Sequence, residues 1–313
     1  SEDWEDFISL LRGEYLTWQK CAINIGLVQD KVKTVEEQLA LVKKQLRYGL
    51  SEDLDLVQLQ QKLEGYRIML EQAQLACDNQ TNKIFQLMGQ VGPSGAGVRP
   101  EKFVANGPVM DETMANSYLI SDSNLKKTAD IMVELQTTNL ETKENAKNMD
   151  VNLVLSTKPN AFTEGFSDSL SRIGNYNENT VTITASRPLA NDKAEAEAKE
   201  AELDHGKALK QRENILLNAK IGLSSLYTNL KRLSNIIKLN ENNLKLAKQR
   251  LALEKKKFRQ GRSSVYFVLQ AEDDLLQAEN SLNETAFARE IVINQIKTLT
   301  DRYLVEYKDI LKL

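Results

Sequence analysis

The sequence is poor in the residues on which most enzyme and metal sites depend. Its 313 residues include one histidine, His205, and two cysteines. This disfavours histidine-based metal sites and Ser-His or Cys-His catalysis, and two cysteines cannot form a zinc cluster alone. We therefore expect a protein that is not an enzyme, with no catalytic residues, no cofactor and no metal site.

Other shortages narrow the class of protein further. Five prolines and fourteen glycines are too few for a turn-rich all-β protein, and 41% hydrophobic residues are too many for a disordered chain. The 44 acidic and 41 basic residues nearly cancel, and no segment shows the basic excess typical of nucleic-acid binding. No run of about eighteen apolar residues is present to form a transmembrane helix.

The first ninety residues have the apolar spacing of two long helices. Apolar or semi-apolar residues recur at intervals of three and four over 18–46 and, with one polar interruption, over 56–87. Gly49 separates the two stretches, and glycine can adopt the left-handed conformation that ends a helix. Ser51 is a good N-cap for the second helix. We predict an antiparallel helical hairpin over 1–90.

The register of this hairpin brings the two cysteines together. If the chain folds back at Gly49, residues whose numbers sum to about 98 face each other, so Cys21 lies opposite Cys77. Two alternatives remain open at this point. The pair is either two small buried thiols or a disulfide, which requires an oxidising compartment and Cα atoms within roughly 7 Å.

The middle of the chain changes in character. A Gly- and Pro-rich stretch, 91–110, reads as a linker, and a helical segment with Asp111 as N-cap follows over 111–149. Apolar residues then alternate with polar ones in two strand-like runs within 150–190. Threonine-rich polar faces suit a membrane β-barrel, although an ordinary surface hairpin has the same pattern. Two strands cannot close a barrel, so other strands or subunits would have to contribute.

A second, longer helical hairpin follows over 191–305, with a short tail over 306–313. Its break lies at Gln260-Gly261-Arg262-Ser263. An offset of 212 residues superimposes the two hairpins without a gap, and the turn pattern [Leu/Phe]-Arg-x-Gly-x-Ser occurs at both breaks. We infer a duplicated module.

The turn motifs and the repeat resemble those of the TolC-type outer membrane efflux proteins. The stretch 247–282, with Phe-Arg-Gln-Gly-Arg-Ser-Ser before Val-Leu-Gln-Ala-Glu, carries most of the likeness, and 180–189 resembles the strand and helix start of the second repeat. The resemblance implies a mainly α fold of two long antiparallel coiled-coil helical hairpins. The 111–149 segment would lie at the equator or in the tunnel, and the β-hairpin would contribute to a trimeric transmembrane β-barrel.

The resemblance also implies a function. The protein would be the outer membrane channel-tunnel of a tripartite efflux or type I secretion system, a passive conduit for small molecules or proteins. Its partners would be two further copies of itself, outer membrane lipid, a periplasmic adaptor (membrane fusion protein) whose docking opens it, and through the adaptor an inner-membrane pump. Most of the chain would lie in the periplasm, and nucleic acid is not an expected partner.

The implied site residues lie around the two turns. The implied adaptor-docking residues are Gly49, Leu50, Ser51, Gly261, Arg262 and Ser263. The implied residues of the tunnel entrance or gate are Asp55, Phe258, Phe267 and Gln270. Phe258 stands where the family commonly has Tyr, Ser263 where it has Arg, and Phe267 and Gln270 where it has Asp. We therefore expect a gate that works differently, by hydrophobic constriction at Phe267.

Two other classes of protein compete with this interpretation. A periplasmic adaptor has one helical hairpin flanked by β-rich domains, whereas this sequence has two hairpins and little β-structure. A soluble coiled-coil scaffold would explain the heptads, but not the threonine-alternating strands or the internal repeat. The family pattern also begins with a helix and β-hairpin that do not precede Trp4, so we expect a truncated or processed chain, or unobserved N-terminal residues.

Overall fold

The computed structural model describes residues 2–49, 51–91, 99–103, 109–160, 176–186, 191–303 and 305–306. The described chain is mostly helical, with one small antiparallel sheet. It forms two compact units. We call Ser1–Asn124 with Asn218–Leu313 the hairpin unit, and Leu125–Leu217 the strand unit.

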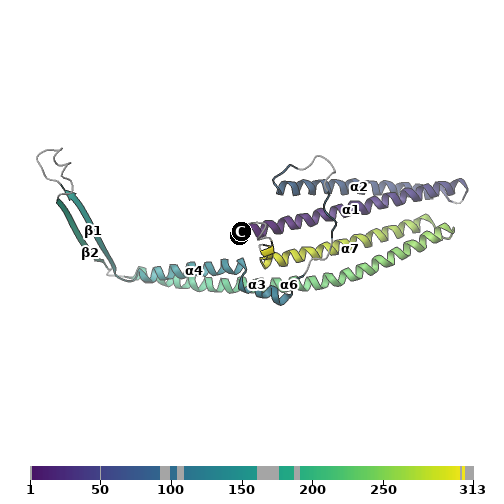
Figure 1. Ribbon diagram of the computed structural model, residues 1–313. Coiled ribbons are helices and arrows are strands. Elements are labelled where there is room, and N and C mark those ends of the chain that lie inside the picture. The colour runs from purple at the N-terminus through teal and green to yellow at the C-terminus, as the bar shows by residue number, and fades with distance from the viewer. Residues whose placement is uncertain are drawn as a thin grey trace, which may run out of the picture. The chain divides into compact units, whose positions relative to one another are not determined.

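The hairpin unit contains two long antiparallel helix pairs. The first hairpin consists of α1 (Glu2–Arg47) and α2 (Asp53–Leu87). The second consists of the later part of α6 (Asp192–Arg259) and α7 (Val265–Leu299). Figure 1 shows these helices side by side, with the two connecting turns at the same end of the unit. The two long helical hairpins expected from the apolar spacing are thus present.

The core near the turns is shared between the two hairpins. Its buried residues come from α1, α2 and α7, and Phe258 of α6 packs against them; they are Val35, Val42, Leu59, Leu63, Tyr66, Val265, Leu269 and Leu276. Because each helix alone exposes its apolar stripe, this cluster stabilises the hairpins against each other and not only each hairpin internally.

A disulfide fixes the first hairpin farther from its turn. Cys21 and Cys77 are bonded, with their Cα atoms 5.3 Å apart, so the structure has the second of the two alternatives raised by the sequence. Beside the disulfide, Trp18 is buried and its indole Nε1 donates to Thr81 Oγ1 at 2.8 Å. The register inferred from a fold at Gly49, which places the two cysteines opposite each other, is the one observed.

The second hairpin packs through small residues. Ala247 on α6 lies in a cluster with Leu275 and Ala278 of α7. Alanines at such a seam let the two helices approach closely, and the Asn240 amide donates to Thr285 Oγ1 at 2.9 Å farther along. The second hairpin therefore holds its register through packing and an amide contact.

The helical segment predicted over 111–149 consists of two helices. The first, α3 (Glu112–Ser121), begins at the predicted N-cap, where the Asp111 side chain accepts from Thr113 N at 3.1 Å. The second, α4 (Asn124–Asn145), begins at a cap that is distant in sequence, because Asp301 accepts from the backbone N–H of Asn124 and from its Nδ2 at 3.1 Å. Local sequence patterns do not contain a cap of this kind.

The strand unit pairs β1 (Asp150–Asn160) with β2 (Tyr176–Ser186). Both strands are longer than the alternating runs that predicted them. The register places Val151 opposite Ala185, Leu153 opposite Ile183, and Leu155 opposite Val181, so the apolar residues share one face. The other face pairs Asn152, Val154 and Ser156 with three threonines. The apolar face is open, with Leu155 and Ile183 each 70% exposed.

In the same unit, α4 packs along the first part of α6. Lys143 Nζ lies 2.7 Å from Glu197 Oε2, and Arg212 bonds to Asp130. None of the helices in the described part of the chain combines the length and hydropathy needed to cross a bilayer. The predicted linker 91–110, the β-hairpin tip and the tail 306–313 lie partly outside the described residues.

Candidate functional site at the hairpin turns

The first turn, residues 48–52, reverses the chain between α1 and α2. Gly49 has φ +68° and donates its N–H to Leu46 O at 3.0 Å, the left-handed helix end that glycine permits. The returning helix begins with a capping box formed by Glu52 and Asp55, whose Oδ2 accepts from Glu52 N at 3.3 Å. Asp55, an expected gate residue, therefore has a helix-capping role, and Leu50 lies outside the described residues.

The second turn, residues 260–264, has the same left-handed backbone conformation at its glycine. Gly261 has φ +66° and donates to Phe258 O at 2.9 Å, while Arg262 N donates to Lys257 O at 2.9 Å. This pair of bonds satisfies carbonyls left open at the end of α6. The duplicated sequence pattern thus corresponds to a duplicated turn.

The two turn serines do not cap the returning helices, as the sequence had suggested for Ser51. The N-cap residues are Glu52 and Ser264. Ser51 Oγ instead donates back to Gln45 Oε1 at 3.2 Å, and Ser263 Oγ donates to Glu254 Oε2 at 2.9 Å. The helix after Ser51 begins one position later than predicted, and in both turns the serine hydroxyl reaches the preceding helix and closes the turn.

The remaining expected gate residues differ in burial. Phe258 packs against the shared core of the two hairpins. Phe267 is 50% exposed and meets Tyr266 edge to face, with ring centroids 5.5 Å apart. Gln270 is exposed and lines a groove with Lys62 and other residues of α2. Phe258 is therefore separated from Phe267 and Gln270, which are three residues apart on α7.

The structure instead shows a polar cluster between the hairpins that the sequence patterns did not indicate. Lys62 Nζ of α2 lies 2.6 Å from Asp273 Oδ1 of α7, and Tyr66 Oη donates to the same oxygen at 2.9 Å. Burial, together with the hydrogen bond to Asp273, raises the pKa of Tyr66 above its usual value. Tyr66 belongs to the apolar spacing found over 56–87, and its ring does lie in the core.

A second polar contact between the hairpins is buried. The Glu272 side chain is 1% exposed, and its Oε1 lies 2.9 Å from Lys255 Nζ of α6 while accepting from Gln38 Nε2 of α1. A carboxylate buried in this way requires such partners, because an uncompensated charge in the interior costs several kcal/mol. Glu272 thus links both helices of its own hairpin to the first hairpin.

Asp273 and Asp274 are adjacent carboxylates that contact two different helices. Both lie more than two turns inside α7, which has no acidic residue in its first turn. Asp273 contacts α2, and Asp274 bonds to Arg250 of α6. The sequence interval between a turn and a carboxylate does not show which helix the carboxylate will meet.

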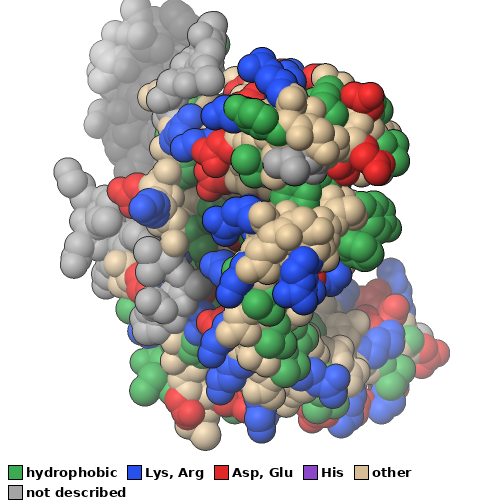
Figure 2. All heavy atoms as spheres, turned by 90° about the vertical axis from the view of Figure 1, so that its right-hand side faces the viewer, with side chains coloured by type: hydrophobic (Ala, Val, Ile, Leu, Met, Phe, Trp, Pro, Cys, Tyr) green, Lys and Arg blue, Asp and Glu red, His purple; other side chains and the backbone are tan. Residues whose placement is uncertain are grey.

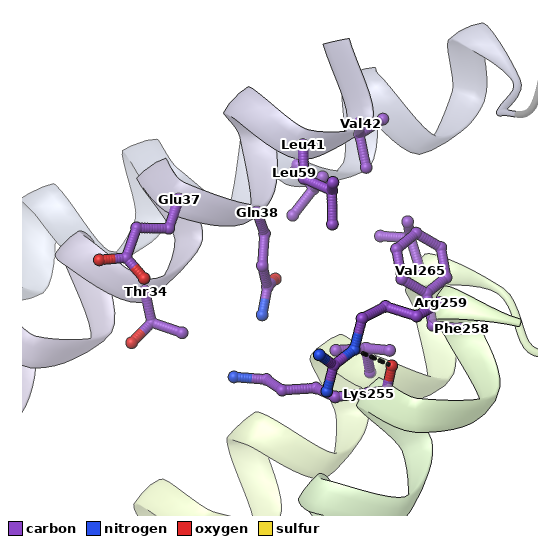
Figure 3. Close-up of a pocket in the computed structure, with 11 residues that line it drawn as sticks. Thr34, Glu37, Gln38, Leu41, Val42, Leu59, Lys255, Phe258, Arg259 and Val265 are labelled. Atoms are coloured by element: carbon purple, nitrogen blue, oxygen red, sulfur yellow. Dashed lines mark hydrogen bonds between the residues drawn. The ribbon is translucent and has the colours of Figure 1, made fainter. Parts of the chain in front are cut away.

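A pocket of about 290 Å³ lies between the turns of the two hairpins. In Figure 3, Gln38 and Lys255 extend toward each other across it, with Val42 and Leu59 on one wall and Phe258 and Val265 at one end. Among the described residues, no group of His, Cys, Asp and Glu side chains could hold a metal ion. The pocket is part of the packing surface between the two hairpins.

The fold is similar to that of solved outer membrane channels. The chain superimposes on CusC, described as forming a transmembrane channel, with TM-score 0.81 and 17% identity, over 96% of this chain and 69% of that one. It superimposes on the outer membrane protein VceC of Vibrio cholerae with TM-score 0.78 and 18% identity, over 95% and 70%. The open state of the MtrE outer membrane channel of Neisseria gonorrhoeae gives TM-score 0.75 at 15% identity, over 95% and 66%.

These similarities identify the class of fold. It is the TolC-type outer membrane factor fold, as the resemblance of the turn motifs implied. The sequence matches no protein-family model and no curated protein. The chain spans about two thirds of the length of the solved structures that it matches.

Proposed function

We propose that the protein is one subunit of a homotrimeric outer membrane efflux channel, a passive conduit without catalytic activity. Its long helices would form a tunnel in the periplasm, and its β-hairpin would contribute to a shared barrel in the outer membrane. The fold supports this proposal, because the solved structures that share it are outer membrane channels. The exported compound would be a small molecule or a protein.

The observation that carries the proposal is the open apolar face of the strand pair. An isolated two-stranded sheet is marginally stable in water, and here one face consists of exposed Val, Leu and Ile while the other carries threonines. Strands with one apolar and one polar face suit a membrane barrel, with lipid outside and a polar lumen inside. Strands from other subunits would close the barrel.

A stripe on α6 supports assembly with other copies. Leu239, Leu246 and Leu253 are seven residues apart and are 68%, 55% and 59% exposed. Apolar residues repeating at a heptad interval are the seam of a coiled coil. The buried seam of the same helix runs through Ala247 and Leu251, so the exposed stripe is a second seam, free for a neighbouring subunit.

Opening would separate the two hairpins at their turns. They are held together there by the shared apolar core and by a few polar contacts among the described residues, chiefly Lys62 and Tyr66 with Asp273, and Gln38 with Glu272. Docking of a periplasmic adaptor at the Gly-x-Ser turns would replace them, and Phe267 and Gln270 would border the entrance in the trimer. An inner-membrane pump would act through the adaptor.

Matched substitutions on the two faces of β2 test the proposal. Ile183→Lys places a charge on the proposed lipid face, where it would cost about 2–4 kcal/mol, whereas Thr182→Lys on the lumen face would cost little. We expect the first variant to be lost from the outer-membrane fraction as a trimer, and the second to assemble normally. Equal assembly of both variants would contradict a membrane role for this sheet.

A further inference from the structure

The second turn is strongly basic. Residues 254–264 contain one carboxylate, Glu254, and five cations: Lys255, Lys256, Lys257, Arg259 and Arg262. Glu254 pairs with Lys257 at 2.7 Å, and Lys255 pairs with the buried Glu272. Lys256, Arg259 and Arg262 are exposed, and the structure shows no carboxylate partner for them among the described residues. We call these three residues the basic patch.

The first turn provides an internal comparison, because it is a copy of the same module. There, three cations, Lys43, Lys44 and Arg47, are balanced by three carboxylates, Glu52, Asp53 and Asp55. At the same offset of 212 residues, the second turn has Ser264, Val265 and Phe267 in place of the three carboxylates. The copy has kept its cations and lacks the acidic residues.

The helix dipole explains only part of this excess. Cations in the last turn of a helix interact favourably with its carbonyl end, and α1 and α6 both have them. Arg262 lies beyond the end of α6, however, and the dipole of α7 would favour acidic residues at its start, where none occur. The surplus positive charge is therefore not required by the fold.

Exposed aromatic residues adjoin the basic patch. Tyr266 and Phe267 are 57% and 50% exposed. Arginine and aromatic side chains are enriched at protein–protein interfaces, where they supply most of the binding energy. Figure 2 looks onto the turns, and Lys and Arg side chains are prominent on this face with hydrophobic side chains between them. The composition is that of a docking surface.

We propose that the second turn binds an acidic surface of a partner protein, with Asp or Glu side chains around an apolar centre. Their carboxylates would meet the basic patch, and the apolar centre would pack on Tyr266 and Phe267. A uniformly anionic membrane fits less well, since the first turn, whose cations and carboxylates balance, lies at the same end of the unit and would add no attraction. This inference rests on the proposed function in that the partner would be the protein that docks at the turns.

Two probes test the charge of the partner. They are helical-hairpin peptides that differ only in their turn, which carries Glu in one and Lys in the other. Binding to the full-length protein in detergent is followed by fluorescence anisotropy. We expect the Glu probe to bind about tenfold more tightly, with the preference weakening as salt rises from about 50 to about 300 mM. Equal binding of both probes would overturn the proposal.

Charge-reversal variants test whether the basic patch is the surface that binds the Glu probe. Lys256→Glu with Arg262→Glu should remove the preference for the Glu probe, while Lys238→Glu with Lys248→Glu, the same charge change at exposed positions of α6 away from the turn, should leave it intact. Vesicles containing phosphatidylglycerol are the third probe. If the turn variant loses vesicle binding while the peptides do not discriminate, the basic patch serves a membrane and the proposal fails.

The inference about the docking surface and the channel proposal can fail independently of each other. If the protein assembles as a trimer in the outer membrane but binds both peptides equally, only the inference about the partner is wrong. If the protein does not assemble there but still prefers the Glu probe in a patch-dependent way, the docking surface stands and the channel proposal fails.

Discussion

At the scale of single residues, the contacts between the hairpins combine apolar packing with a few polar bonds. Tyr66 makes both kinds of contact: its ring is buried in the shared core, and its hydroxyl donates to Asp273 on the other hairpin. A buried hydroxyl without a partner is costly, so this bond defines one relative position of α2 and α7. Such a contact stabilises the packing of the two hairpins against each other.

The raised pKa of Tyr66 makes its contribution pH-dependent. An unfolded tyrosine ionises near pH 10.0, whereas the folded one resists ionisation because of burial and Asp273. Its stabilising effect is therefore complete below pH 10.0 and declines as pH rises beyond it. We expect Tyr66→Phe to lower stability by about 1 kcal/mol at neutral pH, and to flatten the decline in alkaline solution.

Thermal unfolding of the full-length protein, followed by circular dichroism across this pH range, measures the effect. Tyr48→Phe is the matched control, because that side chain is 80% exposed and its replacement should leave the profile of the wild type unchanged. An identical alkaline decline in the wild type and the Tyr66→Phe variant would contradict the assignment.

At the scale of elements, the turns could be predicted in detail while the contacts between helices could not. The turns at Gly49 and Gly261 could be predicted because only glycine readily takes positive φ. The heptad spacing predicted which helix faces pair within the first hairpin. The contacts of Asp273 and Glu272 could not be predicted, because their partners lie on helices more than a hundred residues away in the sequence or across a turn. Nothing in their local spacing specifies how one hairpin rests on the other.

Replacing glycine by alanine should change stability in opposite directions at the turn and within a helix, and this difference tests the turn geometry. Gly261→Ala should destabilise the protein by about 1–2 kcal/mol, because alanine resists the left-handed conformation although no atom crowds the site. Gly222→Ala, within α6 and equally uncrowded, should stabilise it by up to about 1 kcal/mol. Thermal melting of both variants is the measurement, and destabilisation of equal size in both would refute this account of the turn.

The disulfide gives the first hairpin a restraint that the second lacks. Because it closes a loop with a sequence separation of 56, its removal should cost about 4 kcal/mol in a chain-entropy estimate. Trp18, which is buried beside it, reports locally through its fluorescence in a denaturant titration. We expect Cys21→Ser with Cys77→Ser to unfold earlier and to be insensitive to reductant, and an unchanged midpoint would show that the bond adds nothing.

At the scale of the whole molecule, the fold followed from the repeat, the heptads and the turn motifs together. The division of 111–149 into α3 and α4 did not, since Asp301 caps α4 from the far end of the chain. The gate could not be derived either, because Phe258 packs against the core while Phe267 and Gln270 are exposed, and these exposed residues would meet their counterparts only in the proposed trimer. The open faces of the strands and of α6 would be covered in that trimer.

The oligomeric mass of the protein extracted from outer membranes, with the detergent contribution subtracted, tests the channel proposal most directly. The proposal predicts three chains per particle, found only after detergent extraction of that fraction. A monomer or dimer that is released into water without detergent would contradict a shared barrel, and would leave the helical hairpins as a coiled-coil scaffold.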